Sequence, residues 1–371
     1  MSNDRIEALA SRSAARSLPD FPWDVLAPLA DSARSHPEGG IDLSVGTPVD
    51  STPELVQRAL REASNAPGYP TAAGREETRA ACSRWLARST GATVSTSAIV
   101  PAIGSKEVVA GLPRLLGLGA GSRIVIPTVA YPTYAVGGVL AGAEVIASDE
   151  PESVDDVDLV WLNSPGNPTG AVMSVERLAQ IVAWARETGT VVASDECYIE
   201  LGWDAEPISL LHPSVAGDSH DGLLVLHSLS KRSNFAGYRF GFLAGDPALM
   251  SEILLVRKHS GMMVPTPIQA AAVAALDDEA HATEQKERYR RRRGVLAAAV
   301  TAAGFRIDHS EAGLYLWISR DEPCWDTVRW FADRGVIVTP GDFYGPQGDR
   351  HVRMALTATD DDIDRVPARL A

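Results

Sequence analysis

The 371-residue sequence is poor in the features that mark disulfide-bonded, metal-binding and membrane proteins. Its three cysteines, Cys82, Cys197 and Cys324, are odd in number and widely spaced, without a CxxC pair. This pattern favours reduced thiols and predicts neither a disulfide framework nor a metal site. No uninterrupted apolar run approaches the ~20 residues of a membrane helix, and the N-terminal MSNDRIEALASRSAARS lacks the apolar stretch of a signal peptide. We therefore expect a cytoplasmic protein that does not bind membranes.

The chain also lacks an excess of basic residues. Lysine and arginine number 34 against 48 aspartates and glutamates, which gives a formal net charge of -14. An acidic surface repels a phosphate backbone, so no nucleic-acid partner is expected. The one basic run, ERYRRRRG at 287–294, falls in a helix-like stretch, and we interpret it as a solvated helix face.

The remaining composition is that of an ordinary globular protein, with 45% hydrophobic and 22% charged residues and a mean hydropathy of -0.04. A chain of 371 residues exceeds the length of about 250 to 300 at which single cores tend to split. We therefore expect two domains that share one cleft.

Short apolar, β-branched segments alternate with helical ones in the first two thirds of the chain. This alternation predicts an α/β domain with a mainly parallel, seven-stranded sheet. Strands that are apolar on both faces imply helices on both sides of the sheet. The seven segments are 98–103, 122–127, 143–148, 158–163, 190–195, 222–228 and 239–245.

The pattern changes after about residue 260 and predicts a smaller α+β domain. Two helical stretches are followed by three strand-like ones, at 266–276, 284–304, 313–319, 336–341 and 351–357. We expect a large domain at 41–260 and a discontinuous small domain built from 1–40 and 261–371. The first forty residues lack a strand pattern and are expected to pack on the small domain and over the cleft.

Ligands of such sheets bind outside the carboxyl ends of the strands. One of the polar residues there is Lys231, which follows the buried segment 222–228 and, on position alone, is more simply a surface lysine. Its neighbours favour another interpretation, because Ser228 supplies a hydroxyl and Arg239 offers a planar donor fork suited to phosphate. A desolvated lysine attacks aldehydes, and an aldehyde that carries a phosphate is pyridoxal 5′-phosphate.

Other strand ends meet the remaining demands of that cofactor. Asp195 could pair with the pyridine nitrogen and Tyr198 with the phenolic oxygen, although an isolated aspartate at a strand end is more often a cap or turn residue. Asn167, in the turn-like NSPGNPTG, could also bond the phenolic oxygen. Residues 104–106 (Gly104, Ser105 and Lys106) begin a helix whose free N–H groups could bind phosphate, which is a weak signal by itself.

Together these motifs resemble the class I/II aminotransferases of pyridoxal-phosphate (PLP) fold type I. The resemblance runs in the right order from about residue 40 to 360, and the combination is highly specific. The motifs are GYPTAAG (68–74), GSK (104–106), YPTY (131–134), NPTG (167–170), DECY (195–198), SLSKRSNFAGYRFG (228–241) and VRMAL (352–356).

The resemblance implies a catalytic role for three residues. Lys231 would form the Schiff base with PLP and move the proton, Asp195 would pair with the pyridine nitrogen, and Tyr198 would bond the phenolic oxygen. Asn167 would also bond the phenolic oxygen and would contact the substrate. Tyr131 would stack on the cofactor ring. Ping-pong amine transfer between small amino acids and 2-oxo acids would follow.

The resemblance also implies phosphate and substrate contacts. The phosphate would be held by Gly104, Ser105, Lys106, Ser228 and Arg239, with Ser105 and Lys106 acting mainly through backbone amides. Tyr69 would reach the phosphate of the neighbouring subunit, which requires a homodimer with shared active sites. Arg353 would bind the substrate α-carboxylate, where a structural ion pair is the alternative, and Gly46 would line the substrate side.

A narrower likeness concerns the N-terminus and cleft. The segments 21–28, 41–53, 66–74 and 258–271 are similar to those of actinobacterial N-succinyldiaminopimelate aminotransferases of lysine biosynthesis, which implies amine exchange between L-glutamate and N-succinyl-2-amino-6-ketopimelate (EC 2.6.1.17). Phe21, Trp23 and residues 262–266 would form walls of the pocket. For the two aromatic residues, simple packing in the core is an equal alternative. Alternatives are an aminotransferase for aspartate, alanine or aromatic substrates, a PLP-dependent C–S lyase, and a PLP-sensing regulator.

Overall fold

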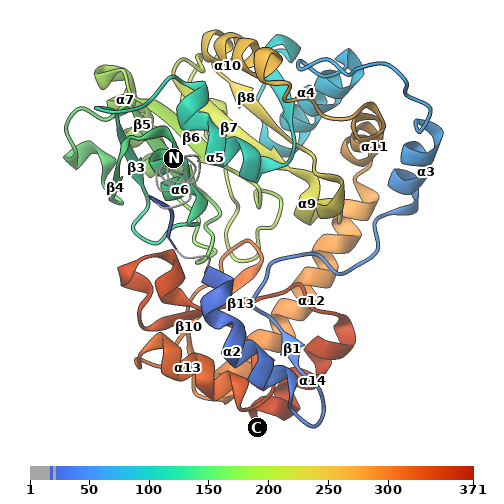
Figure 1. Ribbon diagram of the computed structural model, residues 1–371, viewed down its shortest axis with the longest axis vertical. Coiled ribbons are helices and arrows are strands. Elements are labelled where there is room, and N and C mark those ends of the chain that lie inside the picture. Colours follow the sequence, from blue (N-terminus) through green and yellow to red (C-terminus); the bar gives the residue numbers. More distant parts are fainter. Residues whose placement is uncertain (1–16, 20–21) are drawn as a thin grey trace, which may run out of the picture.

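The computed structural model describes residues 17–19 and 22–371 and divides into a larger and a smaller part (Figure 1). The larger part is built on a seven-stranded sheet in the order β2-β8-β7-β6-β5-β3-β4. All neighbouring strands are parallel except β8, which is antiparallel to β2 and β7. The predicted mainly parallel seven-stranded sheet is confirmed. Its strands are β2 (Ile99–Ala102), β3 (Arg123–Ile126), β4 (Glu144–Ala147), β5 (Leu159–Asn163), β6 (Val191–Asp195), β7 (Leu223–Ser228) and β8 (Gly241–Gly245).

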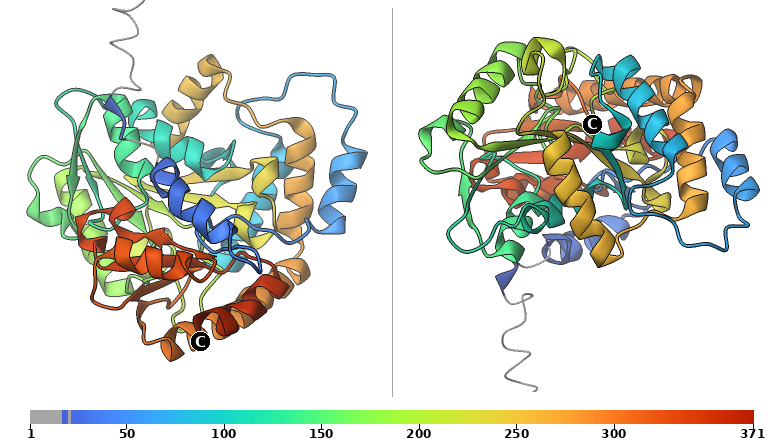
Figure 2. Two further views of the ribbon diagram at one scale, coloured as in Figure 1. Left: turned by 60° about the horizontal axis from the view of Figure 1, so that its bottom comes forward. Right: turned by 90° about the horizontal axis from the view of Figure 1, so that it is seen from above.

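Helices cover both faces of this sheet (Figure 2), so its central strands are buried along their length, as β7 shows at all six positions. Apolar side chains on both faces of a strand are stable only under such double cover. The larger part as a whole contains the helices α3 (Glu54–Glu62), α4 (Glu76–Thr90), α5 (Ser105–Leu115), α6 (Thr133–Ala141), α7 (Val175–Thr188), α8 (Pro213–Ala216), α9 (Leu229–Arg232), α10 (Pro247–Ser260) and α11 (Thr266–Asp277).

The smaller part contains an antiparallel sheet in the order β12-β13-β10-β9 and a short parallel pair, β1 with β11. The strands are β1 (Ile41–Asp42), β9 (Arg306–His309), β10 (Tyr315–Ser319), β11 (Val336–Ile337), β12 (Thr339–Pro340) and β13 (His351–Ala355). The helices are α2 (Pro22–Arg34), α12 (Ala280–Ala302), α13 (Cys324–Ala332) and α14 (Asp360–Leu370). The expected strand at 336–341 is thus two short strands in different sheets.

Two hydrophobic cores correspond to these parts. The first lies around the seven-stranded sheet and takes in Ala271 and Ala272 of α11, which packs against α3 and α4. The second lies under the antiparallel sheet and takes in Ile41 and Leu43. The domain boundaries at 41–260, and at 1–40 with 261–371, stay predictions.

Helix α2 packs against α13 and β11, so this part of the N-terminal segment lies on the smaller part as expected. Residues 1–16 and 20–21, including Phe21, fall outside the described residues. Within the described ranges, no helix is long and apolar enough to cross a membrane.

The basic run in α12 is only partly a solvated face. Arg292 is fully buried and binds both carboxylate oxygens of Asp50, at 2.7 and 2.9 Å, and Asp360 at 2.7 Å. The prediction of a solvated face is therefore wrong for Arg292. Because α12 runs from the larger to the smaller part (Figure 1), the ion pair of Arg292 with Asp50 fixes the segment around Asp50 to the helix that links the two parts.

Candidate active site

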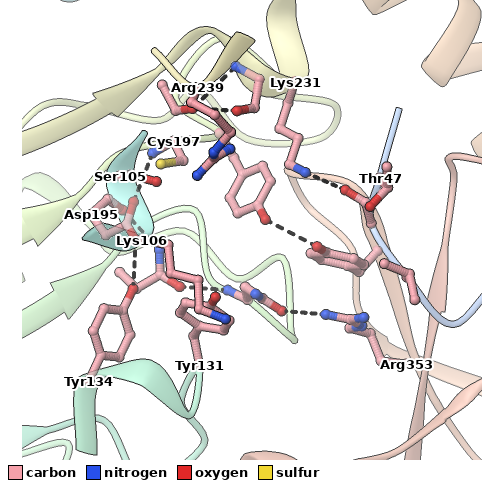
Figure 3. A pocket seen from close by; sticks show the side chains of 18 of the residues that line it. Thr47, Ser105, Lys106, Tyr131, Tyr134, Asp195, Cys197, Lys231, Arg239 and Arg353 are labelled. Carbon is pink, nitrogen blue, oxygen red and sulfur yellow. Dashed lines mark hydrogen bonds between the residues drawn. The ribbon is translucent and has the colours of Figure 1, made fainter. Parts of the chain in front are cut away.

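A cavity of about 440 Å³ lies at the carboxyl ends of β5, β6 and β7, where side chains of both parts converge (Figure 3). Eleven of the residues predicted for the site line it: Gly46, Ser105, Lys106, Tyr131, Asn167, Asp195, Tyr198, Ser228, Lys231, Arg239 and Arg353. Other lining residues are Trp23, Val45, Thr47, Tyr134, Asn163, Cys197, Ser230 and Tyr315. The residues singled out at separate strand ends, where ligands of such sheets bind, therefore converge on one cavity.

Lys231 is presented to this cavity by the short helix α9, which follows β7 directly. The Ser228 side chain caps α9 by accepting a hydrogen bond from the Ser230 amide at 3.2 Å. The ammonium of Lys231 donates a hydrogen bond to the Gly46 carbonyl oxygen. Burial lowers the pKa of Lys231, because desolvation disfavours the charged amine. A neutral amine, the form that attacks an aldehyde, is thereby favoured.

Asp195 ends β6 and is held by two neighbours. Its Oδ2 accepts a hydrogen bond from the Tyr134 hydroxyl at 3.0 Å, and its Oδ1 accepts one from the Cys197 amide at 3.2 Å. Burial raises the pKa of Asp195, while these hydrogen bonds oppose the rise. A buried carboxylate in this state gains free energy from a cationic partner such as a protonated pyridine nitrogen.

Two asparagines shape the loop after β5. Asn163 donates from Nδ2 to the Asp195 carbonyl at 2.8 Å and accepts at Oδ1 from the Asn167 amide at 2.7 Å. Asn167 in turn accepts at Oδ1 from Arg353 Nη1 at 2.9 Å. The side-chain NH₂ of Asn167 is thus left to donate to a ligand, as a contact to a phenolic oxygen requires.

The first turn of α5 faces Arg239 and forms a cradle for an anion. Gly104 precedes this 11-residue helix with φ of 75°. A Cβ at Gly104 would lie 2.4 Å from Arg239 Nη2, so only glycine lets the guanidinium approach the helix N-terminus. Arg239 itself has φ of 59°. Exposed N–H groups, a guanidinium and the Ser228 hydroxyl are a donor set that fits the phosphate of PLP.

Arg353 is buried, with 3% of its surface exposed, and its contacts are neutral. It donates to Asn167 and to the Ser44 carbonyl oxygen, and its guanidinium lies 4.2 Å from the ring centroid of Tyr315. No carboxylate in the described part of the chain forms an ion pair with it, unlike Arg292. The expected alternative of a structural ion pair is therefore not what these contacts show. A buried cation without a counterion favours binding of an anionic ligand.

Two predicted site residues, Tyr69 and Gly104, and the predicted wall segment 262–266 lie away from the cavity or at its edge. Tyr69 is 97% exposed and does not line the cavity of its own chain. Gly104 adjoins the cavity without lining it. Trp23 is a wall residue as predicted, whereas residues 262–266 do not line this cavity.

Tyr134, Asn163, Cys197 and Tyr315 were not predicted as site residues. Tyr134 had a signal in the YPTY motif: it lies in the first turn of α6, beside Tyr131 of the preceding loop at a centroid distance of 5.8 Å. The sequence around Tyr315 contains no signal that marks it as a site residue. Its role depends on pairing with β13, which aligns β10 with the strand of Arg353.

The comparisons with known proteins agree with this geometry. A family model described as "Aminotransferase class I and II" matches residues 38–370. The 4-dedimethylamino-4-oxo-anhydrotetracycline transaminase OxyQ of Streptomyces rimosus is 53% identical over 357 residues, which cover 96% of this chain and 99% of OxyQ. "Probable aminotransferase Rv1178" of Mycobacterium tuberculosis is 54% identical, over 95% of this chain and 85% of its own length.

Solved structures share the whole fold. An aminotransferase from Neisseria meningitidis superimposes with a TM-score of 0.89 at 29% identity and covers 96% of this chain and 98% of its own. A "probable N-succinyldiaminopimelate aminotransferase" from Thermus thermophilus has a TM-score of 0.85 at 25% identity, with 94% and 99% covered. These similarities extend over the larger and the smaller part together.

Proposed function

Because this chain belongs to the class I and II aminotransferases, which depend on PLP, we propose that it transfers the amine of L-glutamate to N-succinyl-2-amino-6-ketopimelate and catalyses the reverse reaction. The proposal places the enzyme in lysine and diaminopimelate synthesis (EC 2.6.1.17). The observation that carries the amino-acid part of this proposal is the buried, counterion-free guanidinium of Arg353. A substrate α-carboxylate supplies the missing negative charge.

The predicted site residues that line the cavity have proposed tasks. PLP, when bound, supplies an electron sink for the charge that develops at the substrate α-carbon. Lys231 provides the covalent attachment and its Nζ accepts the proton from that carbon, which its lowered pKa permits. Asp195 would accept a hydrogen bond from the protonated pyridine nitrogen, while Asn167 and Tyr198 would donate to the phenolic oxygen.

The remaining tasks are positioning. We assign the phosphate to the amides of residues 104–106 with Ser228 and Arg239, and the face of the ring to Tyr131. Tyr69, exposed in the single chain, is proposed to complete the phosphate site of a second copy, so that the enzyme is a homodimer with shared sites.

The succinylated substrate is supported by a further cation in the cavity. Lys106 is exposed, lines the cavity and places its ammonium 5.9 Å from the ring centroid of Tyr131. No ion pair engages it among the described residues. Its backbone serves the phosphate site, so its side chain is available for a distal carboxylate of a long substrate. The likeness to the Thermus protein supports the same assignment.

A second candidate has a different acceptor. The 53% identity to OxyQ favours amine transfer to a ring ketone of the kind its name describes. Such an acceptor is large and lacks an α-carboxylate next to its ketone, so it would bypass Arg353 in that half-reaction. The two candidates therefore differ in how far Arg353 is needed.

Single-turnover absorbance changes of the PLP-bound protein distinguish these functions. L-glutamate, N-succinyl-L,L-diaminopimelate, aspartate, alanine and tyrosine are each mixed with the wild type and with Arg353→Gln. We expect fast conversion with glutamate and the succinylated amine, and a loss of at least about a hundredfold in both for Arg353→Gln. Fast conversion of aspartate or tyrosine with none of the succinylated compound would refute the specific assignment, and pyruvate release from cystathionine would indicate a lyase.

A further inference from the structure

Tyr315 lies in the cavity wall between Tyr198, a proposed cofactor residue, and Arg353, a proposed substrate residue. It is the first residue of β10, is 2% exposed and lines the cavity. A Cβ on Gly46 would lie 2.2 Å from its hydroxyl oxygen, so the peptide that accepts the hydrogen bond of Lys231 is packed directly against this tyrosine. Tyr315 therefore contacts groups on both sides of the site.

On the cofactor side, the contact is between two hydroxyl groups. The Tyr315 oxygen lies 3.1 Å from the Tyr198 oxygen, and the rings pack edge to face at 5.8 Å and 77°. A tyrosine hydroxyl has one proton, so when Tyr198 donates to a ligand it can only accept from Tyr315. Donors in series polarise one another, which strengthens the terminal hydrogen bond.

On the substrate side, the contact is with the ring. The Arg353 guanidinium carbon lies 4.2 Å from the Tyr315 ring centroid, within the range of a cation–π interaction. The ring thus supports the cation proposed to bind the substrate carboxylate. The hydroxyl and the ring of one residue act on different functional groups, and substitutions can separate them.

We propose that Tyr315 is a positioning residue with two separable actions: its hydroxyl strengthens donation by Tyr198 to the cofactor's phenolic oxygen, and its ring holds Arg353 in place for the substrate carboxylate. This inference rests on the roles of Lys231, Tyr198 and Arg353 in the proposed function and deepens them. It assigns a function to a residue that carries no reacting atom.

The hydroxyl action has a spectroscopic consequence. Donation by Tyr198 stabilises negative charge on the phenolic oxygen, so that oxygen attracts the proton on the cofactor-bound nitrogen of Lys231 less strongly. Removing the Tyr315 hydroxyl weakens that donation and makes this nitrogen more basic. The other titratable or charged groups that face Lys231 or Tyr198 are Asp195, Cys197, Arg239 and Arg353. All of them are retained when only the Tyr315 hydroxyl is removed.

The test is a pH titration of the visible absorbance of the PLP-bound protein without substrate. For Tyr315→Phe we expect the titration midpoint to rise by about half a pH unit, or about threefold in proton affinity. Tyr344→Phe is the matched control, because the Tyr344 ring centroid lies 5.1 Å from the same guanidinium carbon but Tyr344 does not contact Tyr198. The titration midpoint of this control should match that of the wild type. A rise below about 0.2 unit in Tyr315→Phe, or an equal rise in the control, overturns the hydroxyl action.

The ring action is measured with glutarate, a dicarboxylate that has no amine or ketone to react. Tyr315→Phe keeps the ring and should keep the glutarate Kd within about twofold, whereas Tyr315→Leu should raise it about fivefold. Equal glutarate Kd values for Tyr315→Phe and Tyr315→Leu overturn the ring action. Lys231→Ala separates this inference from the proposed function: if that variant still shows the pH-dependent absorbance of the wild type, the assignment of Lys231 has failed, whatever Tyr315 does.

Discussion

The hydroxyl of Tyr134 donates a hydrogen bond to Asp195 Oδ2 across 3.0 Å, from α6 to the end of β6. Tyr134 is completely buried and stacks on Trp161 at a centroid distance of 5.1 Å and an interplanar angle of 26°. The carboxylate proposed to pair with the cofactor is therefore oriented by a side chain that is itself fixed by the core of the larger part.

Replacement of Tyr134 by phenylalanine should slow the reaction with L-glutamate about tenfold. The ring and its stacking remain, but the pKa of Asp195 rises further when this hydrogen bond is lost, so its ionised fraction falls more at low pH. Single-turnover rates measure the effect, and a larger deficit at low pH than at high pH is expected. Tyr238→Phe, which alters a tyrosine stacked on Phe235, should change the rate less than twofold, and equal rates for the two variants would contradict this role.

Gly104→Ala should weaken PLP binding more than tenfold. A methyl group there would lie 2.4 Å from Arg239 Nη2 and push the guanidinium away from the first turn of α5. Gly117→Ala is a matched control, because Gly117 has a φ of 76°, nearly that of Gly104, but no atom within 4 Å of its Cβ position. Both variants should lose about 1 kcal/mol of stability from backbone strain, whereas only Gly104→Ala should lose cofactor affinity in an equilibrium titration.

Subunit mixing tests whether Tyr69 acts in the site of a second copy. Tyr69→Ala and Lys231→Ala should each be nearly inactive as separate preparations. In a hybrid dimer both defects fall in one site and the other site is intact. Unfolding and refolding the two variants together should restore up to about a quarter of the wild-type activity, since half of the dimers are hybrids with one good site. Absence of recovery, in preparations shown to contain hybrids, would mean that sites are not shared.

Glu196→Gln should stabilise the folded apoprotein by an amount that increases with pH. Burial raises the pKa of Glu196 to about 8, and its Oε2 lies 3.4 Å from Nε2 of the buried His227. A carboxyl with a raised folded-state pKa contributes its full stability below the unfolded pKa of 4.5 and loses it as pH rises through 8. The Tm advantage of Glu196→Gln should therefore grow between pH 5 and 8 in thermal unfolding. Parallel curves of Tm against pH for the two proteins would contradict this expectation.

The sequence was most informative where local pattern and chemistry coincide. All seven strands of the larger sheet have apolar runs in their sequence, including the partly exposed edge strand β4, so all seven were predicted, and the polar residues that follow them locate the cavity. Strand β9 is an edge strand with the same partial exposure, but it was missed because its sequence, RIDH, has no apolar run. The buried Arg292 was missed for another reason: Asp50 and Asp360, which neutralise it, are distant in the sequence.

The same limit explains the site residues that were not predicted. Lys231 and Asp195 belong to local motifs whose composition indicates their chemistry. Tyr315 and the counterion-free state of Arg353 depend on which strands pair and on what lies opposite, and a strand's own residues do not specify its partners.

The segment between β1 and α3 connects the two parts of the chain without regular structure, yet it is fixed along its length. The carbonyl oxygens of Ser44, Val45 and Gly46 accept hydrogen bonds from Arg353, Thr357 and Lys231 respectively. Further along, Asp50 binds Arg292, and the Thr52 hydroxyl donates to the Asn234 carbonyl. Surface loops commonly vary in length between homologues, but an insertion here would displace a wall of the cavity. Among active relatives, this connection should therefore keep a constant number of residues.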